Sequence, residues 1–459
     1  MEEPACPGCR ALLQRVAELE ARIADLTRRL EEALRAGKRQ AAPFRKGPPQ
    51  PDPKTPGRKA GDAHGTHGHR PPPPEPISEC HEAHLPNACP ECQGRIVEYE
   101  VTEQFQTEIP RRPLVRKFRV HIGECVECGQ RVQGRHPLQT SDALGAAASQ
   151  IGPDAQAAAT VLHTHLGLSH GKVAAVFLSL FGIRLTRGAS AQINLRAAAR
   201  LEPDYQRVLE AVRDSEQLAA DETGWRIGGH PAWLHAWVGD RATAYGIDPQ
   251  RSAAVLERVI GRDWAGILSH DGFASYERFT EALHQQCAAH VLQRARELLA
   301  EATRGAVRFP RQVIALFTEA IHWRNRHRRG EVSLDALQAQ RDGFEERLWQ
   351  LTRRPRTVPE HEQLAKHLWK HHDQWFHFLT NPDIEPTNWQ AEQAVRPAVV
   401  NRKVWGGNRT AAGAKAQGVL MSVFETCRRQ VHSVVDHVSQ TLRWFGNRLL
   451  PRPVLLPGR

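Results

Sequence analysis

Two acidic residues close apolar runs in this chain in a way that suggests phosphoryl-transfer chemistry. Asp221 follows "QLAA" and Asp271 follows "AGILSH". Carboxylates that crowd together repel each other and titrate anomalously unless a cation neutralises them. A pair of Mg²⁺ ions about 3.5–4 Å apart removes the repulsion and stabilises the charge that develops at a reacting phosphate. Because Mg²⁺ takes hard oxygen ligands and keeps several waters, two or three carboxylates are enough to hold it.

The elements that must bring these acids together follow from the apolar patterning. Three strands are predicted from "QLAAD", "PAWLHAWVGD" and "ATAYGID", with a turn at Gly228-Gly229. A helix is predicted at "SAAVLERVI" and a fourth strand at "AGILSHD". This order is that of an RNase H-like core, in which the first and fourth strands are neighbours. Asp221 and Asp271 are therefore expected to meet.

A third acid is expected from a later helix, and Glu392 is the candidate. Thr387 and Gln390 have the spacing of a capping box, which predicts a helix start. Glu392 then lies just inside the helix, and Arg396 shares its face one turn later. Pro397 is expected to end or kink the helix.

Two cysteine pairs predict a structural Zn²⁺ site. They are Cys89 with Cys92 and Cys125 with Cys128, separated by the strand-like runs "RIVEYEVTEQFQTEI" and "VRKFRVHIGE". Four thiolates form a closed tetrahedral zinc site, so a zinc ribbon is predicted. A further pair, "CPGC" at Cys6–Cys9, stands alone; two chains could pool their pairs into one site.

The N-terminal region predicts self-association followed by a tether. Apolar residues recur with a and d spacing from Leu12 to Ala33, flanked by Glu and Arg. We favour a short parallel coiled coil over a lone amphipathic helix, because an isolated helix this short is marginal. From Gly37 to Ser78 the chain is rich in Pro, Gly and basic residues and is expected to be a disordered linker.

Composition and charge indicate a polyanionic partner. The chain has 459 residues, a net charge of +11 and a pI of about 9.5. This balance favours nucleic acid, although a generic basic protein remains the alternative. The N-terminus lacks an apolar signal core and no apolar run is long enough to cross a bilayer, so neither export nor a membrane partner is expected. A helix, a Gly turn and a second helix from Arg187 are compatible with a DNA-binding helix-turn-helix, with ordinary packing as the alternative.

Four tracts resemble the successive motifs of insertion-sequence family 66 transposases. They are "ADETGW", "ILSHDGFASY", "CAAHVLQRARELL" and "TNWQAEQAVRP" with the following "NRKVWGGNRTAAGAKAQGVLMSVFETCRR". The order of zipper, basic tether, four-cysteine finger, helical segment and core resembles that family over nearly the whole chain. The family's usual Asn-Asn-x-Ala-Glu-Arg is here "NWQAEQ", and the helix-turn-helix lacks the usual aromatic residue. Contacts to DNA are expected to differ at both places.

The resemblance implies a member of the DDE superfamily with its acidic triad on Asp221, Asp271 and Glu392. These three acids would hold two Mg²⁺ or Mn²⁺ ions. It implies cleavage at the ends of a DNA element by water, then attack of the freed 3′-hydroxyl on target DNA. The implied partners are double-stranded DNA (terminal inverted repeats and target), other copies of the chain, and accessory proteins of the same element. The implied location is the bacterial cytoplasm, at the nucleoid. The candidate phosphate-binding residues are Arg294, Arg396, Arg402 and Arg409.

Two neighbours of the triad are assigned supporting roles. Glu222 would point to the opposite strand face from Asp221 and is interpreted as structural. His290, three positions after Cys287, could bind zinc, but a buried polar His packed beside the site is favoured.

The predicted fold class is multidomain α/β, with an RNase H-like mixed sheet. The predicted parts are a coiled coil (1–37), a linker (38–78), a zinc ribbon (79–137), a helical helix-turn-helix-like segment (138–214), a catalytic core (215–300 and 382–432), a helical insertion (301–381) and a C-terminal tail (433–459). Two alternatives to a transposase stay open: a catalytically inactive, DNA-binding descendant, and an RNase H-like nuclease acting on RNA or junctions. The presence of all three acids favours the transposase.

Overall fold

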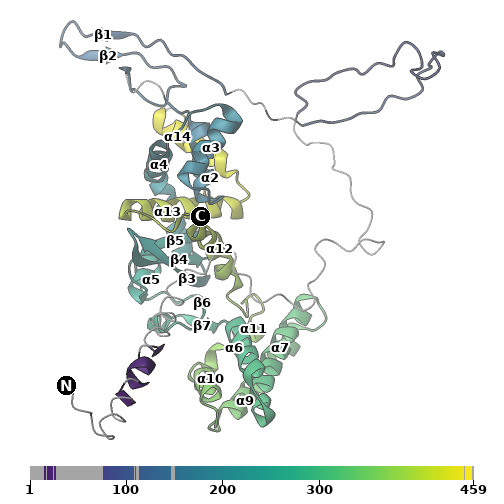
Figure 1. Cartoon of the computed structure of the whole chain (residues 1–459), viewed down its shortest axis with the longest axis vertical. Helices are drawn as coiled ribbons and strands as arrows, with labels where there is room; N and C mark the ends of the chain where they lie inside the picture. The colour runs from purple at the N-terminus through teal and green to yellow at the C-terminus, as the bar shows by residue number, and fades with distance from the viewer. Residues whose placement is uncertain are drawn as a thin grey trace, which may run out of the picture. The chain divides into compact units, whose positions relative to one another are not determined.

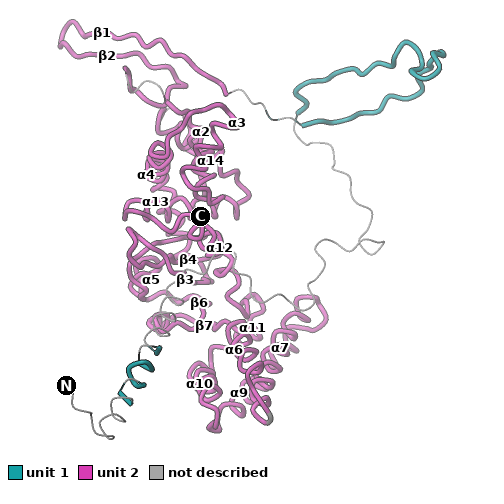
Figure 2. Tube along the Cα trace, in the orientation of Figure 1, with its two compact units in different colours: residues 1–109 teal, residues 110–459 magenta. Residues whose placement is uncertain are grey.

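The computed structural model describes residues 15–16, 18–23, 25–26, 76–107, 109, 113–145, 150–448 and 450–456. The chain divides into two compact units, residues 1–109 and 110–459, which are coloured separately in Figure 2. Most of the predicted linker, both ends of the predicted coiled coil, and Cys6 and Cys9 lie outside the described residues.

Unit 1 contains the central part of the predicted coiled coil. Its described residues between 15 and 26 are helical (Figure 1), as the heptad spacing predicts. The apolar side chains Val16, Leu19, Ile23 and Leu26 are all exposed on this single chain. Self-association through them stays a prediction.

The predicted strands between the two cysteine pairs are mostly not formed. No strand occurs in the described part of 76–109, and in the following segment only β1 (Ile122–Glu124) pairs, antiparallel with β2 (Arg131–Gln133). The apolar side chains of these segments, such as Val97, Val101 and Val115, are exposed. A two-stranded ribbon without a covered face is marginal in water, so alternation alone is a poor predictor here.

The centre of unit 2 is a five-stranded mixed sheet in the order β5-β4-β3-β6-β7. The first three strands form the predicted antiparallel meander, and β6 pairs in parallel with β3, so the expected meeting of the first and fourth strands is confirmed. The sequence did not predict β7, whose "LHQQ" has no apolar alternation. The strands are β3 (Gln217–Ile227), β4 (His230–Val238), β5 (Thr243–Asp248), β6 (Ile267–His270) and β7 (Leu283–Gln286).

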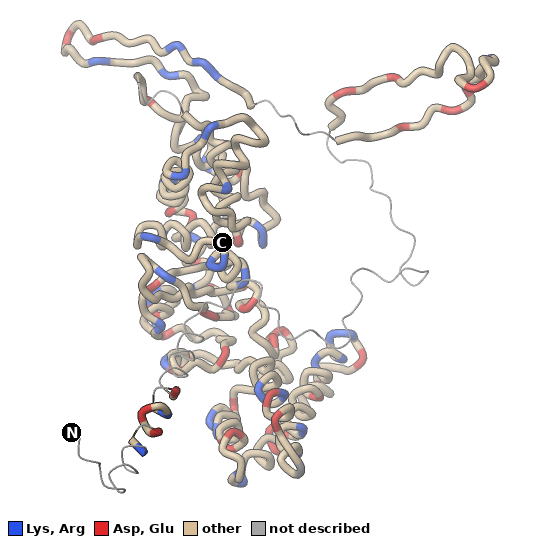
Figure 3. The backbone as a smooth tube through the Cα atoms, viewed as in Figure 1, with Lys and Arg blue, Asp and Glu red and all other residues tan. Residues whose placement is uncertain are grey.

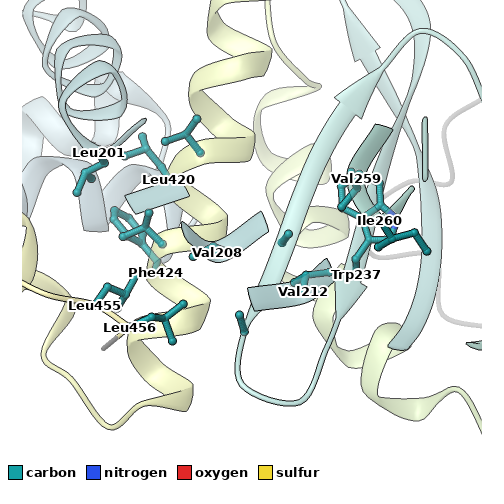
Figure 4. Packing of buried hydrophobic residues seen from close by; sticks show 14 of the residues in the cluster. Leu201, Val208, Val212, Trp237, Val259, Ile260, Leu420, Phe424, Leu455 and Leu456 are labelled. Atoms are coloured by element: carbon teal, nitrogen blue, oxygen red, sulfur yellow. The ribbon is translucent and has the colours of Figure 1, made fainter. Parts of the chain in front are cut away.

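Helices cover both faces of this sheet. On one face, Leu218 and Ala220 of β3 pack with helices α4, α5 and α13 in the largest core cluster, part of which is shown in Figure 4. On the other face, Ala219 packs with α12. Alternate residues of β3 therefore belong to opposite layers. The helices are α4 (Arg187–Arg213), α5 (Ala253–Ile260), α12 (Trp389–Trp405) and α13 (Ala411–Arg429).

The helix, Gly turn and helix predicted ahead of the sheet are present. Helix α3 (His170–Phe181) ends at Gly182, which has φ +66°, and α4 begins after Thr186, whose hydroxyl accepts from the N–H of Ala189. Helix α2 (Pro153–Thr164) precedes them and packs on α4. The second half of α4 enters the main core through Leu201 and Val208. Its first half is the part that carries the predicted recognition surface.

The stretch predicted as a helical insertion is helical and has its own core. Large aromatic side chains fill that core, among them Phe317, Trp375 and Phe376. In Figure 1 these helices lie together, apart from the layers of the sheet. The helices of this stretch are α7 (Arg308–Arg328), α8 (Leu334–Gln338), α9 (Arg341–Thr352), α10 (Pro359–Lys370) and α11 (His377–Thr380). Helix α6 (Ala288–Glu301), which was predicted as part of the catalytic core, packs into the same cluster.

The C-terminal segment, predicted only as a tail, folds onto the domain. Helix α14 (Val434–Gly446) packs against α2, and Leu455 and Leu456 are buried in the main core (Figure 4). Among the described helices, none combines the length and the apolar character needed to span a bilayer.

Candidate active site

Strand β3 places Asp221 in the middle of the sheet, opposite Ala236 of β4. The prediction that Asp221 ends its strand is wrong, because β3 continues to Ile227 as one arm of the Gly228-Gly229 hairpin. Its parallel pairing with β6, however, ends at Ala219. Asp221 therefore lies two positions after the last residue of β3 that pairs with β6. It is on the face of the sheet that α12 covers.

Asp271 follows β6 directly, as the sequence indicates. One carboxylate oxygen accepts from the backbone N–H of Phe273 at 2.9 Å. Gly272 between them has φ +91°, and a Cβ there would come within 2.7 Å of Gln286. A glycine is thus needed for the tight turn that directly follows Asp271.

Glu392 lies in the first turn of α12, but the helix does not start as predicted. Asn388 occupies the N-cap position without a side-chain cap, so the capping box of Thr387 and Gln390 is not formed. The fully buried amide of Asn388 donates instead to the carbonyl of Ala220 at 2.8 Å. A tertiary bond to the strand that carries Asp221 has replaced the local cap.

Pro397 neither ends α12 nor prevents it from reaching Trp405. Proline removes one intrahelical hydrogen bond. Burial of Ala391, Ala394 and Ala398 against the sheet outweighs this loss.

The three acids lie close enough to affect one another's ionisation. Burial raises the pKa of Asp221 to about 7, and the negative charges of Glu222, Asp271 and Glu392 raise it as well, against the lowering effect of a backbone hydrogen bond. Desolvation and like charge both disfavour the ionised carboxyl. A buried carboxyl with acidic neighbours is the environment that a divalent cation would relieve.

Glu222 sits on the other face of β3 from Asp221 and is held by two partners. Its buried carboxylate accepts from Arg251 Nε at 2.6 Å and from the hydroxyl of Tyr276 at 2.7 Å. The structural interpretation of Glu222 therefore agrees with its contacts.

Arg251 links this pair to the acids. Its guanidinium lies over the rings of Phe273 and Trp233, 3.9 and 4.7 Å from their centroids, and is 3.9 Å from Asp271. Sequence reasoning missed Arg251, because nothing in the spacing of a loop arginine shows which strands it will reach. Tyr276 belongs to the tract "ILSHDGFASY", and the resemblance of this tract to a family motif was the signal in the sequence that could have indicated a role for Tyr276.

A cavity of about 380 Å³ opens beside the acids. Asp271, Cys287, His290, Arg294 and Trp375 are among its lining residues. His290 is 48% exposed, so the prediction of a buried histidine is wrong; it lies at the cavity, with Nδ1 3.9 Å from a carboxylate oxygen of Glu392. A hydrogen bond to Cys287, aided by the nearby negative charges, raises the pKa of His290 to about 9 despite desolvation.

The four candidate arginines differ in their surroundings. Arg294 lines the cavity, while Arg396 and Arg409 are exposed. Arg402 is half-buried, and its guanidinium donates to the backbone carbonyl of Gly224 in β3. Arg402 therefore braces α12 on the sheet in this structure. Figure 3 shows Lys and Arg interspersed with Asp and Glu over the helices of unit 2.

The two cysteine pairs fall in different units but have the same local geometry. The N–H of Cys89 donates to Gly94 O at 3.0 Å, and that of Cys125 donates to Gln130 O at 2.9 Å. In both turns the residue four positions after the first cysteine has a positive φ. Hydrogen bonds from the backbone N–H of the second cysteine and of the residue before it lower the pKa of Cys89 and of Cys125.

Comparison with protein families matches residues 148–416 to the model described as "Transposase IS66 family". Comparison with curated proteins finds no match. The matched span begins just before α2, ends in α13, and contains all three acids. Since it covers more than half of the 459 residues, this chain belongs to the IS66 family of transposases.

Proposed function

We propose that this transposase cleaves DNA at the ends of its element and joins them to target DNA, with Asp221, Asp271 and Glu392 as a DDE triad on an RNase H-like core. The observation that carries the proposal is the parallel pairing of β3 with β6, which ends two residues before Asp221, together with the position of Asp271 directly after β6. The pKa of Asp221, raised to about 7 by burial and by neighbouring acids that include the other two, supports the same assignment.

The donor set fits divalent cations with hard-ligand preference. The three side chains offer only carboxylate oxygens, and the nearby cation Arg251 is already paired with Glu222 at 2.6 Å. Two Mg²⁺ or Mn²⁺ ions held there would supply stabilisation of charge on the attacking and leaving oxygens.

The chain's own contribution is to position these ligands. Asn388 fixes the start of α12 to Ala220, next to Asp221, and so sets where Glu392 stands. Glu222 and the surrounding aromatic rings hold the positively charged guanidinium of Arg251 at a distance of 3.9 Å from Asp271. Both devices place carboxylates before a cation or DNA arrives, which lowers the cost of organising the site during reaction.

DNA would be held mainly through phosphates. Arg294 at the cavity and the exposed Arg396 and Arg409 are the proposed contacts near the triad. The first half of α4, which begins at Arg187, is the proposed recognition surface for the element ends. Phosphate contacts provide affinity, while base contacts from such a helix provide end specificity.

The N-terminal region is proposed to add a zinc ribbon and a coiled coil. The matching turns at Cys89 and Cys125 support a shared four-thiolate Zn²⁺ site, because each turn directs N–H groups at its cysteines. The exposed a and d residues of 15–26 support pairing with a second copy.

The test is strand cleavage of DNA that carries the element's own ends, with Mg²⁺ present. Asp221→Asn, Asp271→Asn and Glu392→Gln should each reduce the rate on the order of a thousandfold, because each removes a metal ligand while keeping side-chain size. Asp263→Asn is the matched control, since Asp263 is exposed in the turn before β6.

The outcomes separate the transposase from its inactive descendant. Wild type that binds the ends and never cuts with Mg²⁺ or Mn²⁺ would favour the DNA-binding descendant. If the wild type cuts DNA and a variant that lacks one of the acids cuts it equally well, that acid does not belong to the triad.

A further inference from the structure

A second group of candidate metal ligands lies beside the triad and is chemically unlike it. Cys287 Sγ, a ring nitrogen of His290 and a carboxylate oxygen of Glu392 all lie within 4.8 Å of one another. We infer that these three side chains form a binding site for Zn²⁺ or a similar borderline-soft transition-metal ion, and that this site shares Glu392 with the proposed catalytic site. The consequence for catalysis rests on the proposed function; the binding itself does not.

The backbone holds this group together from two helices. Helix α6 begins just after Cys287, so His290 lies in its first turn, and Glu392 lies in the first turn of α12. The N–H of Ala288 donates to Pro386 O at 2.9 Å, and the N–H of Asn388 donates to Cys287 Sγ at 3.1 Å. These two bonds join the two helix starts, so the donors are assembled by tertiary structure and not by chance proximity at the surface.

The distances allow an ion to be enclosed with small movements. Zinc bonds of about 2.0–2.3 Å at tetrahedral angles separate ligand atoms by roughly 3.3–3.6 Å. His290 Nδ1 and Glu392 Oε1 are already 3.9 Å apart, and their side chains are 48% and 43% exposed. Cys287 is buried and fixed by the Asn388 N–H. Rotation of the two exposed side chains toward a fixed sulfur would therefore complete three bonds.

The donor chemistry selects the ion. A thiolate with an imidazole suits Zn²⁺ and similar metals, whereas Mg²⁺ takes oxygen ligands. Three protein ligands leave a fourth position, and the cavity of about 380 Å³ that Cys287, His290 and Asp271 line offers room for a fourth ligand. Water or Asp271 can fill it. The expected affinity is that of an incomplete, accessible site, below that of a closed four-thiolate centre.

Occupancy would interfere with the triad. A carboxylate oxygen of Glu392 that binds an ion beside Cys287 would not be available to the ions proposed to be held with Asp221 and Asp271. The cleavage activity should therefore be inhibited by Zn²⁺ at Mg²⁺ concentrations that saturate the enzyme. Such an arrangement makes strand cleavage responsive to free transition metal through one shared side chain.

The direct test counts zinc. The full-length wild type and Cys287→Ser are equilibrated in the same buffered free Zn²⁺, and bound metal is measured by elemental analysis. We expect the variant to hold about one ion per chain fewer, since serine removes the soft donor. Cys427→Ser is the control, because Cys427 is also buried but lies in the main core. Equal zinc in wild type and Cys287→Ser, with both melting alike, would overturn the site.

A second readout tests the shared ligand. Zn²⁺ is titrated into end cleavage at saturating Mg²⁺, and Cys287→Ser should need at least about tenfold more Zn²⁺ for half inhibition, equivalent to about 1.4 kcal/mol of lost binding. Equal sensitivity of the two proteins would overturn the sharing of Glu392. If neither protein cleaves DNA, the zinc count still decides the metal site, and the proposed function alone fails.

Discussion

Replacing Asp221 by Asn should stabilise the metal-free protein, and the effect should depend on pH. Burial and neighbouring acids raise the folded-state pKa of Asp221 from the ordinary 3.8 to about 7. As pH rises from about 4 to about 7, the unfolded chain gives up this proton while the folded chain keeps it. The wild type therefore loses stability across that window, and the loss is complete above pH 7.

The size of the effect follows from the pKa difference. At 1.36 kcal/mol per pKa unit, a rise from 3.8 to about 7 corresponds to roughly 4 kcal/mol. Asp221 is only half-buried, so screening by water should reduce this to about 2 kcal/mol. The asparagine side chain of the variant does not titrate, so the variant escapes this loss of stability. A gain in unfolding free energy of this size raises the Tm of a protein this large by a few degrees.

The assay is thermal unfolding in chelator at several pH values. Asp221→Asn should equal wild type near pH 4 and exceed it at pH 8, whereas Asp263→Asn should follow wild type throughout. Adding Mg²⁺ should then stabilise wild type more than Asp221→Asn, because the ion binds the folded site. A difference that is absent at pH 8, or constant with pH, would refute the placement of a half-buried Asp221 beside the other acids.

Three further predictions concern the supporting structure. Elemental analysis should find that Cys89→Ser combined with Cys125→Ser loses about one Zn²⁺ per chain relative to wild type; unchanged zinc would disprove the ribbon. Lys in place of Leu19 and Leu26 should lower the oligomer mass in ultracentrifugation, because charges at core heptad positions must be desolvated; an unchanged mass would place the interface elsewhere. Arg251→Gln should slow end cleavage roughly tenfold or more while end binding persists, because Glu222 then stays buried without its cation and Asp271 loses the positive charge beside it; full activity would show that Arg251 does not help to position Asp271.

The order of the sheet was predictable because it depends on local pattern. Alternating apolar residues mark β3, β4 and β5, and the apolar run before Asp271 marks β6. Pairing of the first and fourth strands followed from that order. The polar "LHQQ" of β7 has no such pattern; it is a strand because β6 offers an edge to pair with.

The details around the acids were less predictable because they depend on tertiary contacts. The side-chain amide of Asn388 donates to the backbone carbonyl of Ala220, 168 positions earlier in the sequence, and the expected local cap at Thr387 is not made. Pro397 is tolerated since α12 is packed on the sheet. Arg251 reaches Glu222 and Asp271 from a loop. Spacing along the chain contains no record of such contacts.

The central claim is that divalent ions held by Asp221, Asp271 and Glu392 act on the phosphate that is cut. Replacing a non-bridging oxygen of that phosphate by sulfur tests this directly, because Mg²⁺ binds sulfur poorly and the softer Mn²⁺ accepts it. With an end substrate of this kind, we predict cleavage at least about tenfold slower in Mg²⁺ and restored by Mn²⁺, corresponding to about 1.4 kcal/mol or more at the transition state. Equal rates for the oxygen and sulfur substrates, with both stereoisomers in Mg²⁺, would contradict metal contact with the reacting phosphate.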